Sequence, residues 1–271
     1  MKIALVGYGK MGEALLSQWQ AASLSSFPDY RFVVIDPAAQ PTPEGQEGPK
    51  GAPVFLNAPP PASDSAFDLV ILAVKPQVLD VVAPLYTERL AAGGFVASIA
   101  AGSSIARLKS LTGNAPIVRI MPNLPAAIGA GASGLCADPT TDAAQRGMVE
   151  ALMRAVGSVL WVDDEDQLDR LTAIAGSGPG YVFEIARTYT EAATQLGFSP
   201  DAAKQLVLDT LAGTIEMARQ SPLSLEDLRE SVTSKGGTTA AGLDALNGEG
   251  ELDRLFRSTL SAAYARAVAL R

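Results

Sequence analysis

Two glycine-rich stretches hold the residues best suited to binding a charged ligand. The first, Gly7-Tyr8-Gly9-Lys10-Met11-Gly12, follows the apolar run Ile3-Ala4-Leu5-Val6 and leads into a helical pattern. A G-x-G-x-x-G motif in this order indicates dinucleotide binding. Gly7 permits a tight turn, Gly9 lets a pyrophosphate approach the backbone, and Gly12 lets helix and strand pack closely. The N–H groups at the helix start would face the phosphates, whereas the alternative is an ordinary glycine turn.

The second stretch, Ser234-Lys235-Gly236-Gly237-Thr238-Thr239, lies between two predicted helices. N–H groups and hydroxyls at the start of a helix form a nest for an anion, either a carboxylate or a phosphate. The alternative is a plain helix N-cap by Thr238 or Thr239. Two successive glycines are more than a cap requires, which favours binding.

Asp36 ends a predicted strand at residues 30–36. A carboxylate there can accept hydrogen bonds from both ribose hydroxyls of NAD and would repel the 2′-phosphate of NADP. The next basic residue is Lys50, so the sequence favours NADH over NADPH. The alternative is that Asp36 only caps the turn at Pro37.

Three further segments follow predicted strands: Lys75-Pro76, Ala100-Ala101-Gly102 and Met121-Pro122-Asn123. Each alone is explained by ordinary turn chemistry, since Pro, Gly and Asn end strands. Ligands of open parallel sheets bind beyond the carboxyl ends of the strands. The shared placement of these segments therefore favours a binding site.

The elements that must position these residues change character near Asp163. Before it, apolar strands alternate with helical patterns, which predicts an α/β domain with a Rossmann-type, doubly wound parallel sheet. Strands are expected at 3–6, 30–36, 54–56, 68–74, 94–99, 117–120, 134–137 and 159–162, and helices at 13–20, 77–91, 104–111 and 142–155. After it, only helices are expected, at 165–176, 179–196, 200–220, 224–232, 238–247 and 251–270. We therefore predict a dinucleotide-binding domain over residues 1–162 and an all-helical domain over residues 163–271.

Composition excludes several classes of function. The net charge of −8 (21 basic against 29 acidic residues), without a basic cluster, argues against a nucleic-acid partner. The 271 residues include no histidine and one cysteine, Cys136, which excludes His- and Cys-based metal sites and Ser-His-Asp or Cys-His triads. No apolar run reaches the length of a membrane helix, and the first strand follows Lys2 directly without a leader. We expect a cytoplasmic protein with a small-molecule substrate.

Six ordered blocks resemble the Δ1-pyrroline-5-carboxylate reductase family along essentially the whole chain. The blocks are Gly7-Tyr8-Gly9-Lys10-Met11-Gly12, Ala73-Val74-Lys75-Pro76-Gln77, Ser98-Ile99-Ala100-Ala101-Gly102, Arg119-Ile120-Met121-Pro122-Asn123-Leu124-Pro125, Gly176-Ser177-Gly178-Pro179-Gly180-Tyr181 and Ser234-Lys235-Gly236-Gly237-Thr238-Thr239-Ala240-Ala241-Gly242-Leu243. The last block is close to the signature of the family.

The resemblance implies reduction of pyrroline-5-carboxylate to L-proline with NADH or NADPH. It places the nicotinamide near Val74-Lys75-Pro76 and Met121-Pro122-Asn123, with Ala100-Ala101-Gly102 completing the cofactor pocket. It places the substrate carboxylate at 234–239, with the Thr239 hydroxyl on the ring nitrogen. It further implies a homodimer through the C-terminal helices, compatible with a larger oligomer such as a decamer, and active sites shared between a cofactor domain and the partner's helices.

The lack of histidine agrees with this chemistry, because a protonated cyclic imine needs only hydride, orientation and one hydroxyl. Three residues depart from the family pattern: Lys235 replaces a usual proline, Arg187 a usual acid, and Asp209 a common glutamine. The alternatives are reduction of six-membered imine acids, since one methylene discriminates by only about 1–3 kcal/mol, and a non-catalytic NAD(P)-binding regulator. A hydroxyacid reductase would need a helical lysine base, for which Lys204 has unsuitable neighbours.

Overall fold

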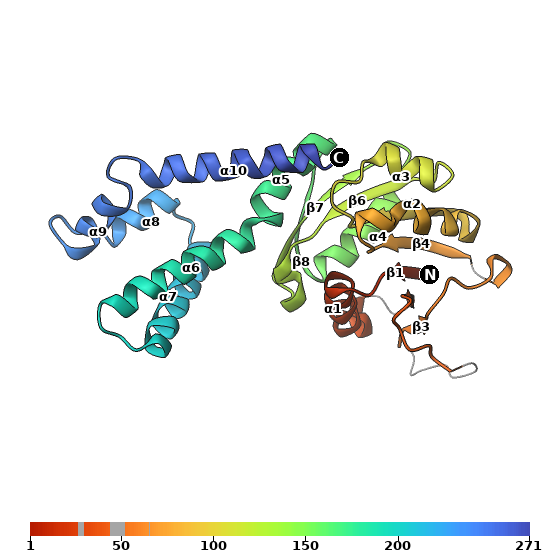
Figure 1. Ribbon diagram of the computed structural model, residues 1–271, viewed down its shortest axis with the longest axis horizontal. Coiled ribbons are helices and arrows are strands. Elements are labelled where there is room, and N and C mark those ends of the chain that lie inside the picture. The colour runs from red at the N-terminus through yellow and green to blue at the C-terminus, as the bar shows by residue number, and fades with distance from the viewer. Residues whose placement is uncertain (27–29, 44–51, 65) are drawn as a thin grey trace. The chain divides into compact units, whose positions relative to one another are not determined.

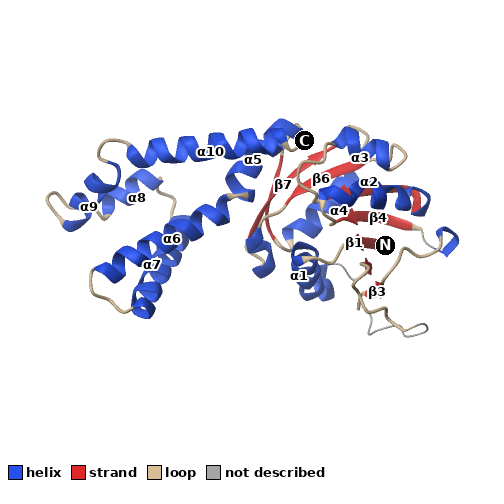
Figure 2. Cartoon of the chain, in the orientation of Figure 1, coloured by secondary structure: helices blue, strands red, loops and turns tan. Residues whose placement is uncertain are grey.

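The computed structural model describes residues 1–26, 30–43, 52–64 and 66–271 (Figure 1). The chain falls into two compact units, one made of Met1–Ser177 with Ala263–Arg271, the other of Gly178–Ala262. The first unit holds a sheet flanked by helices, and the described elements of the second are all helical (Figure 2). Lys50 lies outside the described residues. No described helix is both long and apolar enough to cross a membrane.

All eight described strands form one sheet in the order β3-β2-β1-β4-β5-β6-β7-β8. The strands are β1 (Lys2–Val6), β2 (Arg31–Ile35), β3 (Val54–Leu56), β4 (Phe67–Leu72), β5 (Leu90–Ser98), β6 (Ile117–Met121), β7 (Gly131–Ala137) and β8 (Gly157–Trp161). From β1 the chain adds β2 and β3 on one side, then returns to add β4 and β5 on the other. The order therefore reverses between β1 and β4, which creates the switch point where dinucleotides bind in such sheets.

The predicted α/β class and the parallel-dominated sheet are confirmed, with one departure at β7. The pairs from β3 to β6 are all parallel, but β7 runs antiparallel to β6 and parallel to β8. Residues 122–130 join β6 to β7 through a 3₁₀ segment, Leu124–Ile128. This connection is too short for a parallel crossover, which takes a dozen or more residues, so the chain must reverse.

The central strands are buried on both faces, and alternate residues contribute to two separate cores. On β1, Ile3 and Leu5 belong to one cluster, and Ala4 and Val6 to the other. The first cluster is covered by α1 (Lys10–Ser26) and α4 (Ala143–Arg154), which are linked by a hydrogen bond from Trp19 Nε1 to the Leu152 carbonyl at 2.8 Å. The second is covered by α2 (Leu79–Val82) and α3 (Ile105–Leu111). Helices on both faces make the sheet doubly wound.

The helix predicted at 77–91 is wrong as a continuous element. The chain forms a 3₁₀ segment at Pro76–Val78, the short α2, and a second 3₁₀ segment at Ala83–Arg89. Pro84 lacks an N–H group, and its ring would clash with the preceding turn of an α-helix. After β8 comes α5 (Glu165–Leu171), which continues into a π-helical turn, Thr172–Gly176, where a plain helix to 176 is expected.

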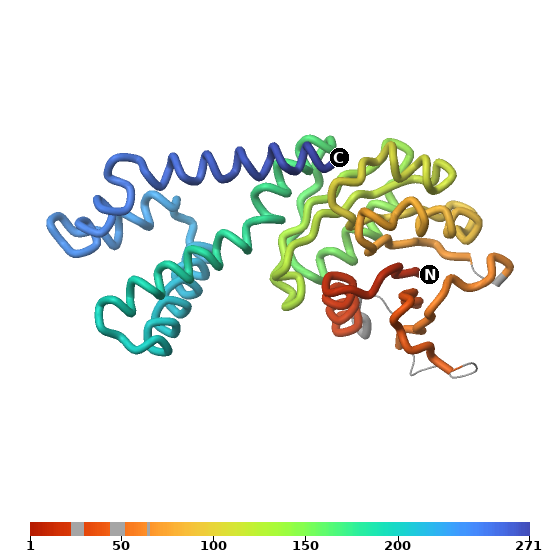
Figure 3. The backbone as a smooth tube through the Cα atoms, viewed as in Figure 1, coloured from red at the N-terminus to blue at the C-terminus, as the bar shows by residue number. Residues whose placement is uncertain are grey.

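The second unit follows the predicted helices closely. It contains α6 (Gly178–Gln195), α7 (Pro200–Gln220), α8 (Leu225–Ser231), α9 (Thr238–Asn247) and most of α10 (Glu251–Ala269). Gly197, with φ of 100°, ends α6 in a conformation that favours glycine, and Ser199 caps α7 through Ala202 N–H. The path from α6 to α10 can be followed along the tube in Figure 3.

Candidate functional site

The three glycines of the first motif occupy three different environments. Gly7 is buried with φ of 98°, and a Cβ there would lie 2.7 Å from the Ala73 carbonyl oxygen. A Cβ on Gly12 would lie 2.5 Å from the Gly7 carbonyl oxygen, whereas a Cβ on Gly9 would meet no atom within 4 Å. Gly7 is thus required by its backbone conformation and by packing, and Gly12 is required by packing. Gly9 is exposed and leaves open space, where the motif expects a pyrophosphate.

The start of α1 completes this cradle. The helix begins at Lys10, and its first backbone hydrogen bond runs from Glu13 N–H to the Gly9 carbonyl at 2.9 Å. The preceding N–H groups have no partner within the helix and present the positive end of its dipole. The open Gly9 and this helix start therefore fit the pyrophosphate of a nicotinamide dinucleotide.

Asp36 is fixed at the end of β2 beside this loop. Its Oδ2 accepts the Tyr8 N–H at 2.7 Å and its Oδ1 accepts the Ala38 N–H at 2.8 Å. The carboxylate therefore does cap its own turn, and it also ties β2 to the glycine loop. Each oxygen retains acceptor capacity for a ribose hydroxyl. Tyr8 packs edge-on against Phe55, and burial, followed by the charge of Glu13, raises the pKa of its phenol.

The other predicted cofactor segments lie at the same edge of the sheet. Ala73 N–H donates to the Val6 carbonyl at 2.7 Å, and Ile99 N–H donates to the Leu72 carbonyl at 3.0 Å. The ladder thus sets the ends of β1, β4 and β5 side by side. Within these segments Lys75 and Ala101 are exposed, while Val74, Pro76 and Gly102 are half-buried and Ala100 is buried.

Asn123 lies in another of the predicted strand-end segments, and its side chain is hydrogen-bonded to backbone groups of the protein. Its amide Nδ2 donates to the Ala175 carbonyl at 3.0 Å, and its Oδ1 accepts the Ala132 N–H at 2.9 Å. It therefore holds the π-helical turn against the start of β7. Met121 supports the same turn, because a Cβ on Gly176 would lie 2.7 Å from the Met121 Cε. Pro122 between them is buried. The side-chain amide of Asn123 is thus occupied within the protein.

The second glycine stretch lies in the other unit, at the start of α9. Gly236 has φ of 73°, and Gly237 is the N-cap of α9, which no side chain caps among the described residues. The alternative that Thr238 or Thr239 is the capping residue is thus wrong, because both lie inside the helix and both are exposed. Ser234 Oγ lies so close that a Cβ on Gly237 would approach it to 2.4 Å. The loop therefore places the Ser234 hydroxyl beside helix N–H groups that have no partner within the helix, as an anion site requires.

One group near the first site is absent from the sequence-based candidates. The guanidinium of Arg119, on β6, is nearly buried and lies 2.5 Å from Glu165 Oε1, which also accepts the Ile105 N–H at 2.9 Å. An arginine inside an otherwise apolar strand is the signal that could have found it, because a buried charge requires a partner.

Three residues depart from the pattern of the family that the sequence resembles, and all three are exposed. Arg187 pairs with Glu184 and Glu191 on the exposed surface of α6, and Lys235 and Asp209 are also exposed.

Comparison with known proteins gives matches along the full chain. Residues 165–270 match the family model described as pyrroline-5-carboxylate reductase dimerisation. Residues 2–102 match the model described as NADP oxidoreductase, coenzyme F420-dependent. A pyrroline-5-carboxylate reductase of Pseudomonas aeruginosa is 36% identical over 270 residues, covering 99% of this chain and 96% of that protein.

Solved structures agree with these matches. The structure of a pyrroline-5-carboxylate reductase from Coxiella burnetii is 32% identical with a TM-score of 0.86, covering 99% of this chain and 97% of that one. The pyrroline carboxylate reductase of Plasmodium falciparum, solved with NADP bound, is 24% identical with a TM-score of 0.80, covering 100% and 98%, and supports the fold alone.

Proposed function

The chain belongs to the pyrroline-5-carboxylate reductase family, and we propose that it reduces Δ1-pyrroline-5-carboxylate to L-proline with NADH or NADPH. When bound, the reduced nicotinamide supplies a hydride. The hydride adds to the carbon of the protonated C=N bond. The electron pair of that π bond moves to nitrogen, and the product is the neutral amine. No further proton is required, which suits a chain without histidine.

The observation that carries this proposal is the presence of both glycine loops in a chain matched over its whole length. The test is oxidation of NADH and of NADPH, followed by absorbance, with the five-membered and six-membered imine acids. We expect turnover with the five-membered substrate. No turnover with either imine would reject a reductase and favour a regulator, and a preference for the six-membered ring would reassign the substrate.

We propose that the cofactor occupies the carboxyl edge of the sheet in the first unit. The loop 7–12 binds the pyrophosphate, and the segments 74–76, 100–102 and 121–123 surround the nicotinamide. This assignment is supported by the open Gly9, the free helix start and the shared edge of β1, β4 and β5.

We further propose that Asp36 makes NADH the preferred coenzyme. The backbone N–H groups of Tyr8 and Ala38 fix its carboxylate where the adenosine ribose is expected, so a 2′-phosphate would meet a fixed negative charge. Asp36→Asn removes this charge and keeps one of the two acceptors for the backbone N–H groups, and it should raise kcat/KM for NADPH relative to NADH by about tenfold. A wild-type preference for NADPH, or an unchanged ratio in the variant, would contradict this role.

The substrate carboxylate, in this proposal, is held by the loop of Ser234, Gly236, Gly237 and Thr238, and the Thr239 hydroxyl contacts the ring nitrogen. Thr239→Ala should lower kcat/KM by about tenfold or more, and Thr239→Ser should recover much of the loss. Thr233→Ala is the matched control, because the Thr233 hydroxyl donates to the Arg229 carbonyl at 2.6 Å and serves the helix end. Equal losses in Thr233→Ala and Thr239→Ala would reject the assignment.

The matched dimerisation model indicates a homo-oligomer. We propose a homodimer through the helices of residues 163–271, able to build a larger oligomer such as a decamer, with residues 1–162 as the cofactor domain. The helices α6 and α7 support this, because large apolar side chains such as Phe183 and Ile215 are more than half exposed in the single chain.

We also propose that each active site combines the cofactor domain of one subunit with the Thr239 loop of its partner. Coexpression of a cofactor-loop variant with Thr239→Ala tests this arrangement. A shared site predicts that mixed dimers regain activity, since one of their two sites then has an intact loop from each subunit. Mixed dimers as inactive as either parent would show that the site lies within one chain.

A further inference from the structure

The last residues of the sequence pack against a turn that the proposed function assigns to the cofactor. Residues 263–271 belong to the compact unit that contains the sheet. Gly102, with φ of 70°, lies so close to the backbone of Leu270 that an added Cβ would approach the Leu270 carbonyl oxygen to 2.3 Å. Gly102 ends the turn Ala100-Ala101-Gly102, so one side of this turn is formed by Leu270.

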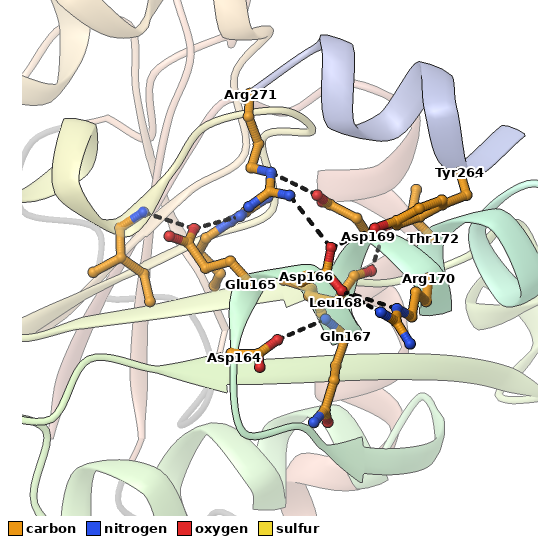
Figure 4. A network of polar contacts seen from close by, with 12 residues as sticks. Asp164, Glu165, Asp166, Gln167, Leu168, Asp169, Arg170, Thr172, Tyr264 and Arg271 are labelled. Carbon is orange, nitrogen blue, oxygen red and sulfur yellow. Dashed lines mark hydrogen bonds and ion pairs between the residues drawn. The ribbon is translucent and has the colours of Figure 1, made fainter.

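Arg271 anchors this tail to α5. Its Nε lies 2.6 Å from Asp169 Oδ2, and its Nη2 lies 3.7 Å from Asp166 Oδ1. Figure 4 shows the guanidinium directed at both carboxylates, with the ring of Tyr264 on α10 beside them. The Tyr264 hydroxyl donates to Asp166 Oδ1 at 2.5 Å. The side chain of Asp169 is only 4% exposed, so its pairing with Arg271 is far less screened than a surface ion pair.

The Asp169 carboxylate depends on nearby cations to remain ionised. Burial raises the pKa of this carboxyl above its usual value, and the nearby Arg271 and then Arg119 offset the rise only in part. A buried carboxylate that loses its cation is strongly destabilised, so the ionised form depends on Arg271 remaining in place.

The same helix also contacts the segment that follows the turn. Glu165 Oε1 accepts the Ile105 N–H at 2.9 Å, three residues after Gly102, and pairs with the nearly buried Arg119 at 2.5 Å. The turn and the residues that follow it are therefore linked to α5 by two routes. One is direct, through Glu165, and the other runs through Asp169, Arg271 and Leu270.

We propose that Arg271 is a positioning residue for the nicotinamide cofactor: by its ion pair with Asp169 it holds Leu270 against Gly102 and so fixes the turn at residues 100–102. This inference rests on the proposed cofactor site. Arg271 does not contact the ligand in this account. Loss of the Arg271 side chain loosens the turn. It therefore weakens binding of the cofactor more than binding of the imine substrate.

Arg271→Ala in the full chain tests the proposal by titration of reduced nicotinamide fluorescence. We expect the Kd of the preferred coenzyme to rise about fivefold or more, with the imine KM at saturating coenzyme changed less than twofold. Arg271→Lys should recover part of the affinity. Arg154→Ala is the matched control, because it removes an exposed ion pair with Glu150 in the same unit, and its Kd should equal that of the wild type.

An unchanged coenzyme Kd in Arg271→Ala, or an equal rise in Arg154→Ala, would overturn the proposal. A lowered melting temperature with an unchanged Kd would likewise reduce Arg271 to a purely structural role. The wild-type assay with both imines is read separately, so an error in the proposed substrate does not affect the comparison of coenzyme affinities.

Hydrogen exchange of the wild-type protein keeps the test independent of variant folding. Coupling between two sites is reciprocal, so coenzyme binding must stabilise the tail if the tail stabilises the coenzyme. The N–H groups of Leu270 and Arg271 donate to the carbonyls of Ala267 and Val268, and we expect their exchange, with that of Ile105, to slow when NADH or NADPH binds. Unchanged exchange of all three in the presence of bound coenzyme would refute the coupling.

Discussion

Gly7 and Gly9 stand two residues apart in one loop, yet alanine should affect them in different ways. At Gly7, φ of 98° and a Cβ 2.7 Å from the Ala73 carbonyl oxygen combine backbone strain with overlap against backbone. Strain of about 1–2 kcal/mol and overpacking of about 1–3 kcal/mol give a loss of roughly 2–5 kcal/mol in the free energy of unfolding. A Cβ added at Gly9 would meet no atom within 4 Å, and the residue caps α1. Replacing a glycine cap by alanine should cost only about 0.5–1 kcal/mol.

Cofactor affinity should separate the two positions further. In Gly9→Ala the methyl group enters the space assigned to the pyrophosphate, so the Kd for NADH should rise about tenfold or more, equivalent to ~1.4 kcal/mol. Unfolding must be measured without coenzyme, because a bound ligand stabilises the folded protein by mass action. Circular dichroism for stability and nicotinamide fluorescence for affinity are suitable assays.

Gly147→Ala supplies the matched control for both assays. Gly147 lies within α4 of the same unit, and a Cβ there would also meet no atom within 4 Å. Alanine should stabilise that helix by about 0.5–1 kcal/mol and leave the Kd unchanged. Two results would refute the reasoning. Normal NADH binding by Gly9→Ala would show that no phosphate approaches Gly9. Equal destabilisation at Gly7 and Gly9 would show that both glycines serve only the turn.

Two further predictions concern ionisable groups outside the proposed site. Burial, followed by the charge of Glu165, raises the pKa of the Cys136 thiol to about 11, so only about one thiol in a thousand is ionised at pH 8. We expect the folded protein to resist alkylation that is rapid in guanidinium chloride, and rapid modification of the native protein would contradict this. Burial opposes ionisation of Asp138, but hydrogen bonds from Lys109 and Thr140 outweigh it and lower the pKa of its carboxyl. A lowered folded pKa adds stability above the unfolded pKa that is lost as pH falls through the folded value. Asp138→Asn should therefore lower the free energy of unfolding by about 1–3 kcal/mol at pH 7, and by progressively less in acid. A difference that did not change with pH would contradict the linkage.

Features set by neighbouring residues have signals in the sequence, although not all of these signals were used, whereas features set by distant contacts have none. The order strand, glycines, helix at residues 2–26 depends on local chemistry, and the structure reproduces it. Pro84 is a local signal too. The apolar pattern around it predicts one helix across 77–91, but Pro84 has no N–H group for an α-helical hydrogen bond, and the chain forms a 3₁₀ segment there. The reversal of β7 could also have been predicted, because the connection 122–130 is too short for a parallel crossover.

The π-helical turn and the network around α5 have no such local signature. Gly176 is drawn against Met121, 55 positions earlier in the numbering (176 − 121), and Asn123 holds the same turn by its Ala175 carbonyl. Arg271 pairs with Asp169, although each alone is an ordinary charge on a helix or at a chain end. Spacing within a helix says which residues share a face, but not which charge from another element will meet them. For this reason the sequence indicates the residues that we propose to bind the ligands. The residues that we propose to position them depend on contacts such as that of Leu270 with Gly102, which only the folded chain brings together.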